Sequence, residues 1–307
     1  MDKRSVKWGG PWVALVTPFD VAGRIDEAAY RRNVDICIAG GCTGLLANGC
    51  TGEFWAQTFE ERVRVMKIAA EAARGRATVI AGTGAFTTGE TIELTRQAKT
   101  VGCDGAMVVP AMFVKPPVED VVAHYQAISD AVELPLMLYN IPSQASIALP
   151  PELVSRLADI KNVVAIKESS RDFTNFYRTV VMAGDRIHVL IGPGGLFGAA
   201  AQTVGAAGFI EGIPNYWTGI TEVWHAAARG DMARALEFQR KALAVRELIE
   251  ANGRNIYTGG KAAMMALGLP GGYPRLPLRP YGEPHLTQLR EGFAQLGIMP
   301  ATAQAAD

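Results

Sequence analysis

A lysine at the end of an apolar run is the residue of this sequence with the clearest capacity for chemistry. Lys167 closes the run 162–167, whose other side chains are nearly all apolar, as in a buried parallel strand. Strand alternation puts Ala165 and Lys167 on one face, so an inward-facing Ala165 implies an inward-facing lysine. An ammonium that loses hydration there has its pKa lowered from about 10.4, and the neutral amine can condense with a ketone to give an iminium, an electron sink. An alternative explains the same spacing at least as well: a lysine at a strand end that extends its ammonium into water and has no chemical role.

Two further features lie at neighbouring strand ends. Tyr139 ends the strand before that of Lys167, so its phenol is placed to pass protons to and from a substrate oxygen. The loop 49–53, Gly-Cys-Thr-Gly-Glu, makes a tight glycine turn whose backbone N–H groups can cradle a carboxylate. A core tyrosine with a satisfied hydroxyl and a plain strand-to-helix connection are the structural alternatives to these two roles.

The elements that must position these residues are eight short apolar runs, each followed by a helix-like segment. Strands are predicted at 12–16, 44–48, 78–83, 105–110, 134–139, 162–167, 187–192 and 207–212. Amphipathic stretches between them include 27–39, 59–73, 89–101 and 118–132. Eight such units predict an α/β fold, a closed parallel (β/α)8 TIM barrel with its chemistry at the carboxyl ends of the strands. A doubly wound open sheet would usually carry a glycine fingerprint after the first strand, and Thr17-Pro-Phe-Asp is not one.

Helical segments continue after the eighth unit, at 231–252, 259–267 and 284–296. No linker rich in Pro, Gly and Ser precedes them, so they are expected to pack on the barrel. The chain is therefore interpreted as a single domain, 1–307, with a barrel over about 10–229 and a C-terminal helical extension over about 230–298.

Composition excludes several classes of partner. The 307 residues carry 30 basic and 30 acidic side chains, which predicts no nucleic-acid partner and no anionic membrane surface. No apolar stretch approaches the roughly 18 to 20 residues of a membrane span. The four cysteines form no CxxC pair and no ligand cluster with the four histidines. We therefore expect no metal site, reduced thiols and a cytoplasmic location.

Several motifs in order make the sequence resemble the dihydrodipicolinate synthase / N-acetylneuraminate lyase family of class I aldolases. The resemblance covers nearly the whole chain, from the segment 13–20 to Arg275-Leu-Pro. Its motifs are Gly49-x-Thr51-Gly52-Glu53, Ile80-Ala-Gly-Thr-Gly84, Tyr139-Asn-Ile-Pro142 and Ile166-Lys167-Glu168.

This resemblance implies roles for the matched positions. Lys167 would be the Schiff-base lysine and Tyr139 the tyrosine of a proton relay. The carboxylate of a 2-oxo acid would be held by the glycine loop, that is by Gly49, Cys50, Thr51 and Gly52, with Thr51 part of the catalytic set. The resemblance also implies a homotetramer built as a dimer of dimers, and no metal or organic cofactor, because the lysine supplies the electron sink.

Departures from the family pattern bear on the substrate. Dihydrodipicolinate synthases have two threonines in the glycine loop, where this chain has Cys50 before Thr51, and a thiol replaces a hydroxyl poorly in a proton relay. Their tyrosine after the fourth strand is missing from 110–113, and their carboxylate-gripping arginine is replaced by Gln144, which carries no charge. The acidic pair of sialic acid lyases is replaced by Gly194-Gly195.

What remains is the catabolic branch of the family. The sequence predicts a lyase for a 2-oxo acid, either an aldolase or a dehydratase of a 2-oxo-3-deoxy sugar acid, a 4-hydroxy-2-oxo acid or a related pyruvate derivative. Gln144, Ile210 and Glu211 are the candidates for binding the distal part of that substrate, and Glu211 could also act as a general acid or base. The alternatives are 4-hydroxy-tetrahydrodipicolinate synthase, which joins pyruvate and aspartate semialdehyde, and a non-catalytic regulatory protein that binds oxo acids.

Overall fold

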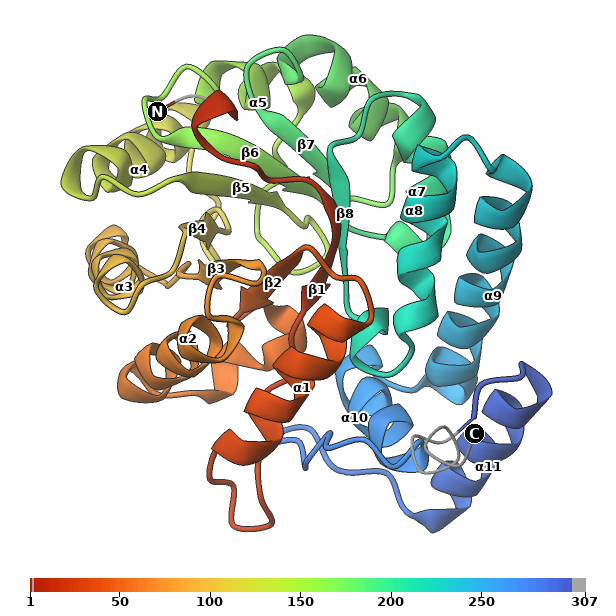
Figure 1. Cartoon of the computed structure of the whole chain (residues 1–307). Coiled ribbons are helices and arrows are strands. Elements are labelled where there is room, and N and C mark those ends of the chain that lie inside the picture. The colour runs from red at the N-terminus through yellow and green to blue at the C-terminus, as the bar shows by residue number, and fades with distance from the viewer. Residues whose placement is uncertain (2, 300–307) are drawn as a thin grey trace.

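The computed structural model, which describes residue 1 and residues 3–299, has the predicted closed parallel barrel with its strands in sequence order (Figure 1). The strands are β1 (Gly10–Ala14), β2 (Gly44–Ala47), β3 (Thr78–Gly82), β4 (Gly105–Val108), β5 (Leu136–Asn140), β6 (Val163–Glu168), β7 (His188–Ile191) and β8 (Gly208–Glu211). Every neighbouring pair is parallel, and β8 pairs with β1 to close the barrel. The predicted fold class is confirmed.

Helices cover the outside of this barrel (Figure 1). They are α1 (Glu27–Ala39), α2 (Phe59–Ala73), α3 (Thr88–Thr100), α4 (Val118–Ala131), α5 (Pro151–Leu157), α6 (Phe173–Ala183), α7 (Gly194–Thr203) and α8 (Thr221–Ala228). The start of α2 is fixed by a capping box, in which the Thr58 hydroxyl accepts from the Glu61 amide and the Glu61 carboxylate accepts from the Thr58 amide.

The two faces of the strands bury different sets of side chains. The barrel interior is filled by a layer of apolar residues that includes Trp12, Leu46, Ile80, Met107, Met137, Ala165, Leu190 and Ile210. The outward-facing residues pack against the helices in a second and larger core. Because Ala165 belongs to the inner set, the alternation along β6 points the side chain of Lys167 into the barrel mouth.

Most predicted element boundaries differ from the structure by one to three residues, and two of these differences have a clear local reason. The first strand was placed at 12–16 but is Gly10–Ala14. Its ladder with β8 ends because the Val16 amide donates to the side-chain oxygen of Asn215, 3.0 Å away, and not to a strand. The helix predicted to start at residue 259 starts at Ile256, because the Asn255 side chain caps it by accepting from the amides of Tyr257 and Thr258.

The C-terminal helices pack onto the barrel beside the glycine loop. They are α9 (Met232–Glu250), α10 (Ile256–Ala266) and α11 (Glu283–Gln295). Helix α9 packs on α7 and α8, while α10 packs on the short 3₁₀ turns η2 (Cys50–Gly52) and η4 (Ile213–Asn215). The extension therefore reaches the site at the barrel mouth from the side of β1, β2 and β8.

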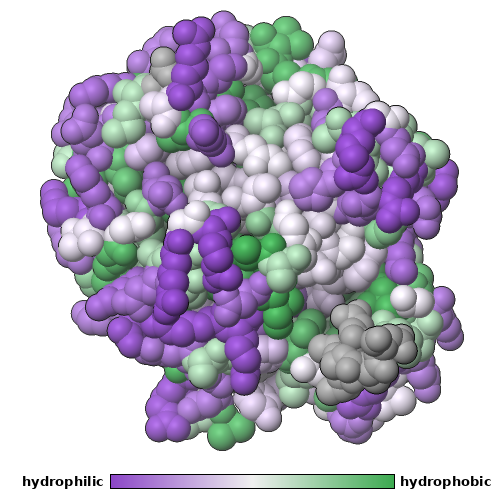
Figure 2. Space-filling model, viewed as in Figure 1, coloured by the Kyte–Doolittle hydropathy of each residue, from purple (hydrophilic) through white to green (hydrophobic). Residues whose placement is uncertain are grey.

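Hydrophilic residues dominate the outer helices on the face shown in Figure 2, with smaller hydrophobic patches between them. Within residues 1 and 3–299, no helix is both long enough and apolar enough to cross a membrane.

Candidate active site

Lys167 and Tyr139 are neighbours in the barrel mouth. They occupy paired positions in the register of β6 and β5, and the Lys167 Nζ lies 4.5 Å from the centroid of the Tyr139 ring. Both side chains are buried, with only 7% of Lys167 exposed. Glu168, on the opposite face of β6, is held instead by the side-chain amides of Asn140 and Asn175. The strand order alone had predicted that the phenol and the amine would meet.

The environment of Lys167 favours the nucleophilic form of its amine. Burial lowers the pKa of Lys167 below its ordinary value of 10.5, and the nearby Cys50 and Glu211 only partly oppose this effect. More of the amine is therefore neutral near pH 7 than in an exposed lysine, and the neutral amine is the form that attacks a carbonyl.

The rate of imine formation should reflect this lowered pKa. Protonation removes the nucleophile, so the rate should fall about tenfold per pH unit below the pKa of Lys167 and level off above it. We expect the midpoint of the profile, measured by quench-trapping of pyruvate adducts across the neutral and alkaline range, below the ordinary 10.5. A midpoint at or above that value would show that the amine is not desolvated when it reacts.

A chain of protonated groups leads from Lys167 to the glycine loop. The Tyr139 hydroxyl donates to the Cys50 Sγ at 3.9 Å, and burial raises the pKa of both groups. The phenol and the thiol therefore both hold their protons at neutral pH. Tyr257 of α10 also interacts with Cys50, and burial raises the pKa of its phenol as well. Sequence reasoning missed Tyr257, because nothing in the composition of α10 distinguishes it from an ordinary packing residue.

The glycine loop is less open than the sequence suggested. The amides of Gly52 and Glu53 donate within the loop, to the carbonyls of Gly49 and Cys50 at 3.0 Å each. In the described part of the chain this leaves the loop amides of Gly49, Cys50 and Thr51 without a backbone acceptor, and of these three residues Cys50 and Thr51 line the cavity described below. Gly52 itself approaches β1 so closely that an added Cβ would lie 3.1 Å from the Leu15 carbonyl oxygen. We therefore assign the cradle to two amides, and Gly49 and Gly52 to shaping the turn.

These groups open onto one cavity of about 210 Å³ at the carboxyl ends of the strands. Seven of the nine residues predicted for the site line it, namely Cys50, Thr51, Tyr139, Gln144, Lys167, Ile210 and Glu211. Gly49 and Gly52 do not line it. The cavity also has polar residues that sequence reasoning missed: Ser143, Ser169, Arg171, Arg246, Asn255 and Tyr257. Arg246 and the last two come from the C-terminal extension, which is remote in sequence from every motif.

Glu211 lies at the end of β8, on the face opposite Ile210, and its carboxylate is bound by backbone amides. The Gly212 amide donates to Oε1 at 2.9 Å, and the Gly195 amide, in the first turn of α7, donates to Oε2 at 3.4 Å. Oε2 also lies 3.9 Å from Nη1 of Arg246. A helix N-terminus and a guanidinium both favour a negative charge at this position.

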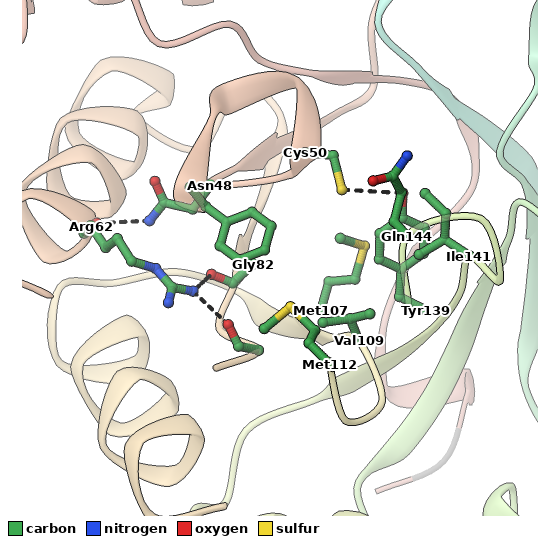
Figure 3. A pocket seen from close by; sticks show the side chains of 12 residues that line it. Asn48, Cys50, Arg62, Gly82, Met107, Val109, Met112, Tyr139, Ile141 and Gln144 are labelled. Carbon is green, nitrogen blue, oxygen red and sulfur yellow. Dashed lines mark hydrogen bonds between the residues drawn. The ribbon is translucent and has the colours of Figure 1, made fainter. Parts of the chain in front are cut away.

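A second, apolar cavity adjoins the first (Figure 3). It is lined mainly by Phe54, Met107, Val109 and Met112, and it shares Cys50, Tyr139, Ile141 and Gln144 with the larger cavity. On its far side the Arg62 guanidinium donates to the carbonyls of Gly82 and Gly84, and its backbone carbonyl accepts from Asn48. Arg62 is therefore occupied in joining α2 to the loop after β3.

A buried amine beside a buried phenol, at the strand ends of a parallel barrel and facing a glycine turn, is the arrangement expected of a class I aldolase. Residues 7–296 match the model of the Dihydrodipicolinate synthetase family. The chain belongs to this family. It is accordingly a lyase of the class I aldolase type.

Relatives of known name agree with this membership. The 4-hydroxy-tetrahydrodipicolinate synthase of Phenylobacterium zucineum is 35% identical over 288 residues, which cover 93% of this chain and 96% of that protein. A dihydrodipicolinate synthase from Acinetobacter baumannii, solved with pyruvate, is 32% identical with a TM-score of 0.88 over 95% of this chain and 99% of that one. A prophage protein of the same family from E. coli K12, also solved with pyruvate, has a TM-score of 0.90 at 26% identity and covers 95% of this chain and 99% of that one.

Proposed function

We propose that this lyase acts on a 2-oxo acid through a Schiff base on Lys167. The observation that carries the proposal is the buried Lys167 amine, 4.5 Å from the Tyr139 ring at the floor of an open cavity. The pyruvate bound in two of the similar solved structures supports a 2-oxo acid as the ligand class.

In this proposal the neutral Lys167 Nζ attacks C2 of the 2-oxo acid and forms a carbinolamine. Tyr139 donates its proton to the oxygen that was the carbonyl and recovers one from the nitrogen, so the carbinolamine is neutral. A second proton from Tyr139 then lets the hydroxyl leave as water, and the nitrogen lone pair forms the iminium. The free amides of Cys50 and Thr51, with the Thr51 hydroxyl, hold the substrate carboxylate. The iminium then accepts the electron pair of the C3–C4 bond in aldol cleavage, or of a C3–H bond when a hydroxyl leaves C4 in dehydration.

Replacing Tyr139 with phenylalanine should slow turnover without emptying the site. The substitution removes the proton donor and keeps the ring that packs beside Lys167, so kcat should fall by about 100-fold or more. Steady-state kinetics would measure the loss, and the mass of the reduced adduct would show that the variant still forms the imine slowly. An unchanged kcat would remove Tyr139 from the mechanism.

A second candidate is 4-hydroxy-tetrahydrodipicolinate synthase, the name carried by relatives that are 35% and 36% identical. Two residues argue against this activity. Gln144 lacks the positive charge of the arginine that the synthases of the family have there, and Cys50 lacks the hydroxyl of their threonine. Turnover of pyruvate with aspartate semialdehyde should therefore be slower than cleavage or dehydration of a 2-oxo-3-deoxy sugar acid, and the reverse order would favour the synthase. A non-catalytic binding protein would give no reducible adduct with any 2-oxo acid.

We further propose a homotetrameric, cytoplasmic enzyme. The loops after β3 and β4 expose large apolar side chains, with Phe86 72%, Phe113 91% and Val114 55% exposed. Such side chains favour burial against another copy of the chain.

The four cysteines are free thiols, which supports the proposed cytoplasmic location because the cytoplasm is a reducing compartment. The proposed assembly is tested by mass. Light scattering should give the mass of four chains, and replacing Phe113 with serine should lower it. A wild-type monomer would contradict the proposed assembly.

A further inference from the structure

Basic residues outnumber acidic ones in the lining of the larger cavity. Three are basic, Lys167, Arg171 and Arg246, and one is acidic, Glu211. If the proposed function holds, the carboxylate of a 2-oxo acid and the chemistry at Lys167 occupy the floor near the glycine loop. The two arginines belong to other segments of the wall, Arg171 just after β6 and Arg246 on α9. Their charge is therefore available to the far end of the substrate.

One nitrogen of the Arg246 guanidinium is hydrogen-bonded within α9, and the other is free to donate. Only 7% of the residue is exposed. Its Nη2 donates to Glu250, one turn further along α9, at 2.8 Å. Its Nη1 lies 3.9 Å from the nearest oxygen of Glu211, which is too long for a hydrogen bond. Within residues 1 and 3–299 no other acceptor is found for Nη1, so two carboxylates orient the guanidinium while one edge keeps its hydrogen-bonding capacity at the cavity.

Arg171 adds a second cation. No ion pair or hydrogen bond partner is found for its guanidinium in the described residues. Its backbone has a φ of 66°, in the left-handed region that non-glycine residues rarely adopt and that clusters at ligand sites. The charge of Arg171 also acts on the Tyr257 phenol, opposing the effect of burial on its pKa, so Arg171 lies near the α10 side of the cavity.

We propose that Arg246, with Arg171, binds a second carboxylate at the distal end of the substrate, so that the preferred substrates are 2-oxo diacids. The guanidinium fork matches a carboxylate in geometry and charge, and a nearly buried one gains most from an anionic partner. Glu211 acts as a positioning residue, fixed by the Gly195 and Gly212 amides, that keeps Arg246 directed at the cavity. A distal end carrying only hydroxyls would leave the free edge of Arg246 and the Arg171 guanidinium without an anionic partner.

The test compares diacids with monoacids of equal carbon number by isothermal titration calorimetry, which reports binding whether or not an imine forms. The pairs are 2-oxoglutarate with 2-oxopentanoate and 2-oxoadipate with 2-oxohexanoate. We expect the wild type to bind the diacid of at least one pair about 10- to 100-fold more tightly, the range of a hydrogen bond to a charged group. Equal affinity within both pairs would overturn the proposal.

Variants assign the preference to the residue. Arg246→Met should reduce the diacid-to-monoacid ratio by about tenfold or more, and Arg246→Lys should keep part of it, because the charge stays and the fork is lost. Arg240→Met, on the exposed side of the same helix, is the matched control and should keep the wild-type ratio. A ratio that survives in Arg246→Met would overturn the assignment. Borohydride trapping tests the Schiff base separately. If no adduct is trapped but the preference for diacids persists, the Schiff-base proposal is refuted and the proposal of a distal carboxylate site is not.

Discussion

Replacing Lys167 with alanine should abolish the borohydride-reducible adduct with pyruvate and lower turnover by about 10⁴-fold or more, the order seen when a covalent nucleophile is removed. The wild type should gain the mass of one reduced pyruvate per chain when treated with borohydride. The alanine variant has no amine at the floor of the cavity and should gain none. Intact-mass spectrometry measures both outcomes directly.

A matched control separates site chemistry from general lysine reactivity. Lys161 lies just before the same strand, where its ammonium is exposed and lies 3.8 Å from the Glu133 carboxylate. Water solvates this ammonium and it lies outside the cavity, so Lys161→Ala should trap pyruvate like the wild type. An adduct that persists in Lys167→Ala, or that disappears in Lys161→Ala, would contradict the assignment of Lys167.

The proximity of Lys167 and Tyr139 could be predicted from sequence because their positions depend on periodic features. An apolar run with one lysine at its end gives the strand, alternation gives the face, and the order of parallel strands makes Tyr139 the neighbour. The same reasoning could not fix Glu211, because a residue at a strand end may turn to either face. The structure places it opposite Ile210, among the amides at the start of α7.

The distal wall could not be predicted for a different reason. Arg246 and Tyr257 enter the cavity from helices that follow the barrel, and each is one polar residue in an amphipathic segment. Only the packing of α9 on α7 and of α10 on the glycine loop brings them to the site. Packing of this kind depends on side-chain shape over many residues, and a spacing rule does not capture it.

The contact between the extension and the glycine loop includes a buried ion pair. Glu53, the last residue of the glycine motif, and Lys261 of α10 are 0% and 1% exposed, with Nζ 2.5 Å from Oε1. Lys261 also donates to the Tyr273 carbonyl at 2.7 Å, and the Arg275 amide donates to the other Glu53 oxygen at 3.1 Å. Burial lowers the pKa of Lys261 to about 8, with Glu53 opposing this effect, so Lys261 keeps its positive charge at neutral pH.

Lys261→Met should therefore destabilise the protein by about 3 to 5 kcal/mol, because it leaves the Glu53 carboxylate buried without a cation. Urea unfolding at a fixed protein concentration measures this cost. Removing both charges in Glu53→Gln with Lys261→Met should recover a large part of it, because no unpaired charge then remains. The double variant should still bind 2-oxo acids less tightly than the wild type, since Glu53 continues the turn that presents the amides of Cys50 and Thr51.

The exposed pair of Arg64 and Glu27 serves as the comparison for this experiment. It has a similar separation, 2.6 Å, but its side chains are 46% and 38% exposed, so Arg64→Met should cost less than about 1 kcal/mol. Water solvates the remaining Glu27 carboxylate, whereas no water reaches Glu53 to do the same. If Lys261→Met cost no more than Arg64→Met, the buried pair would not be what holds the glycine loop to the C-terminal extension, and apolar packing of α10 would have to account for that contact.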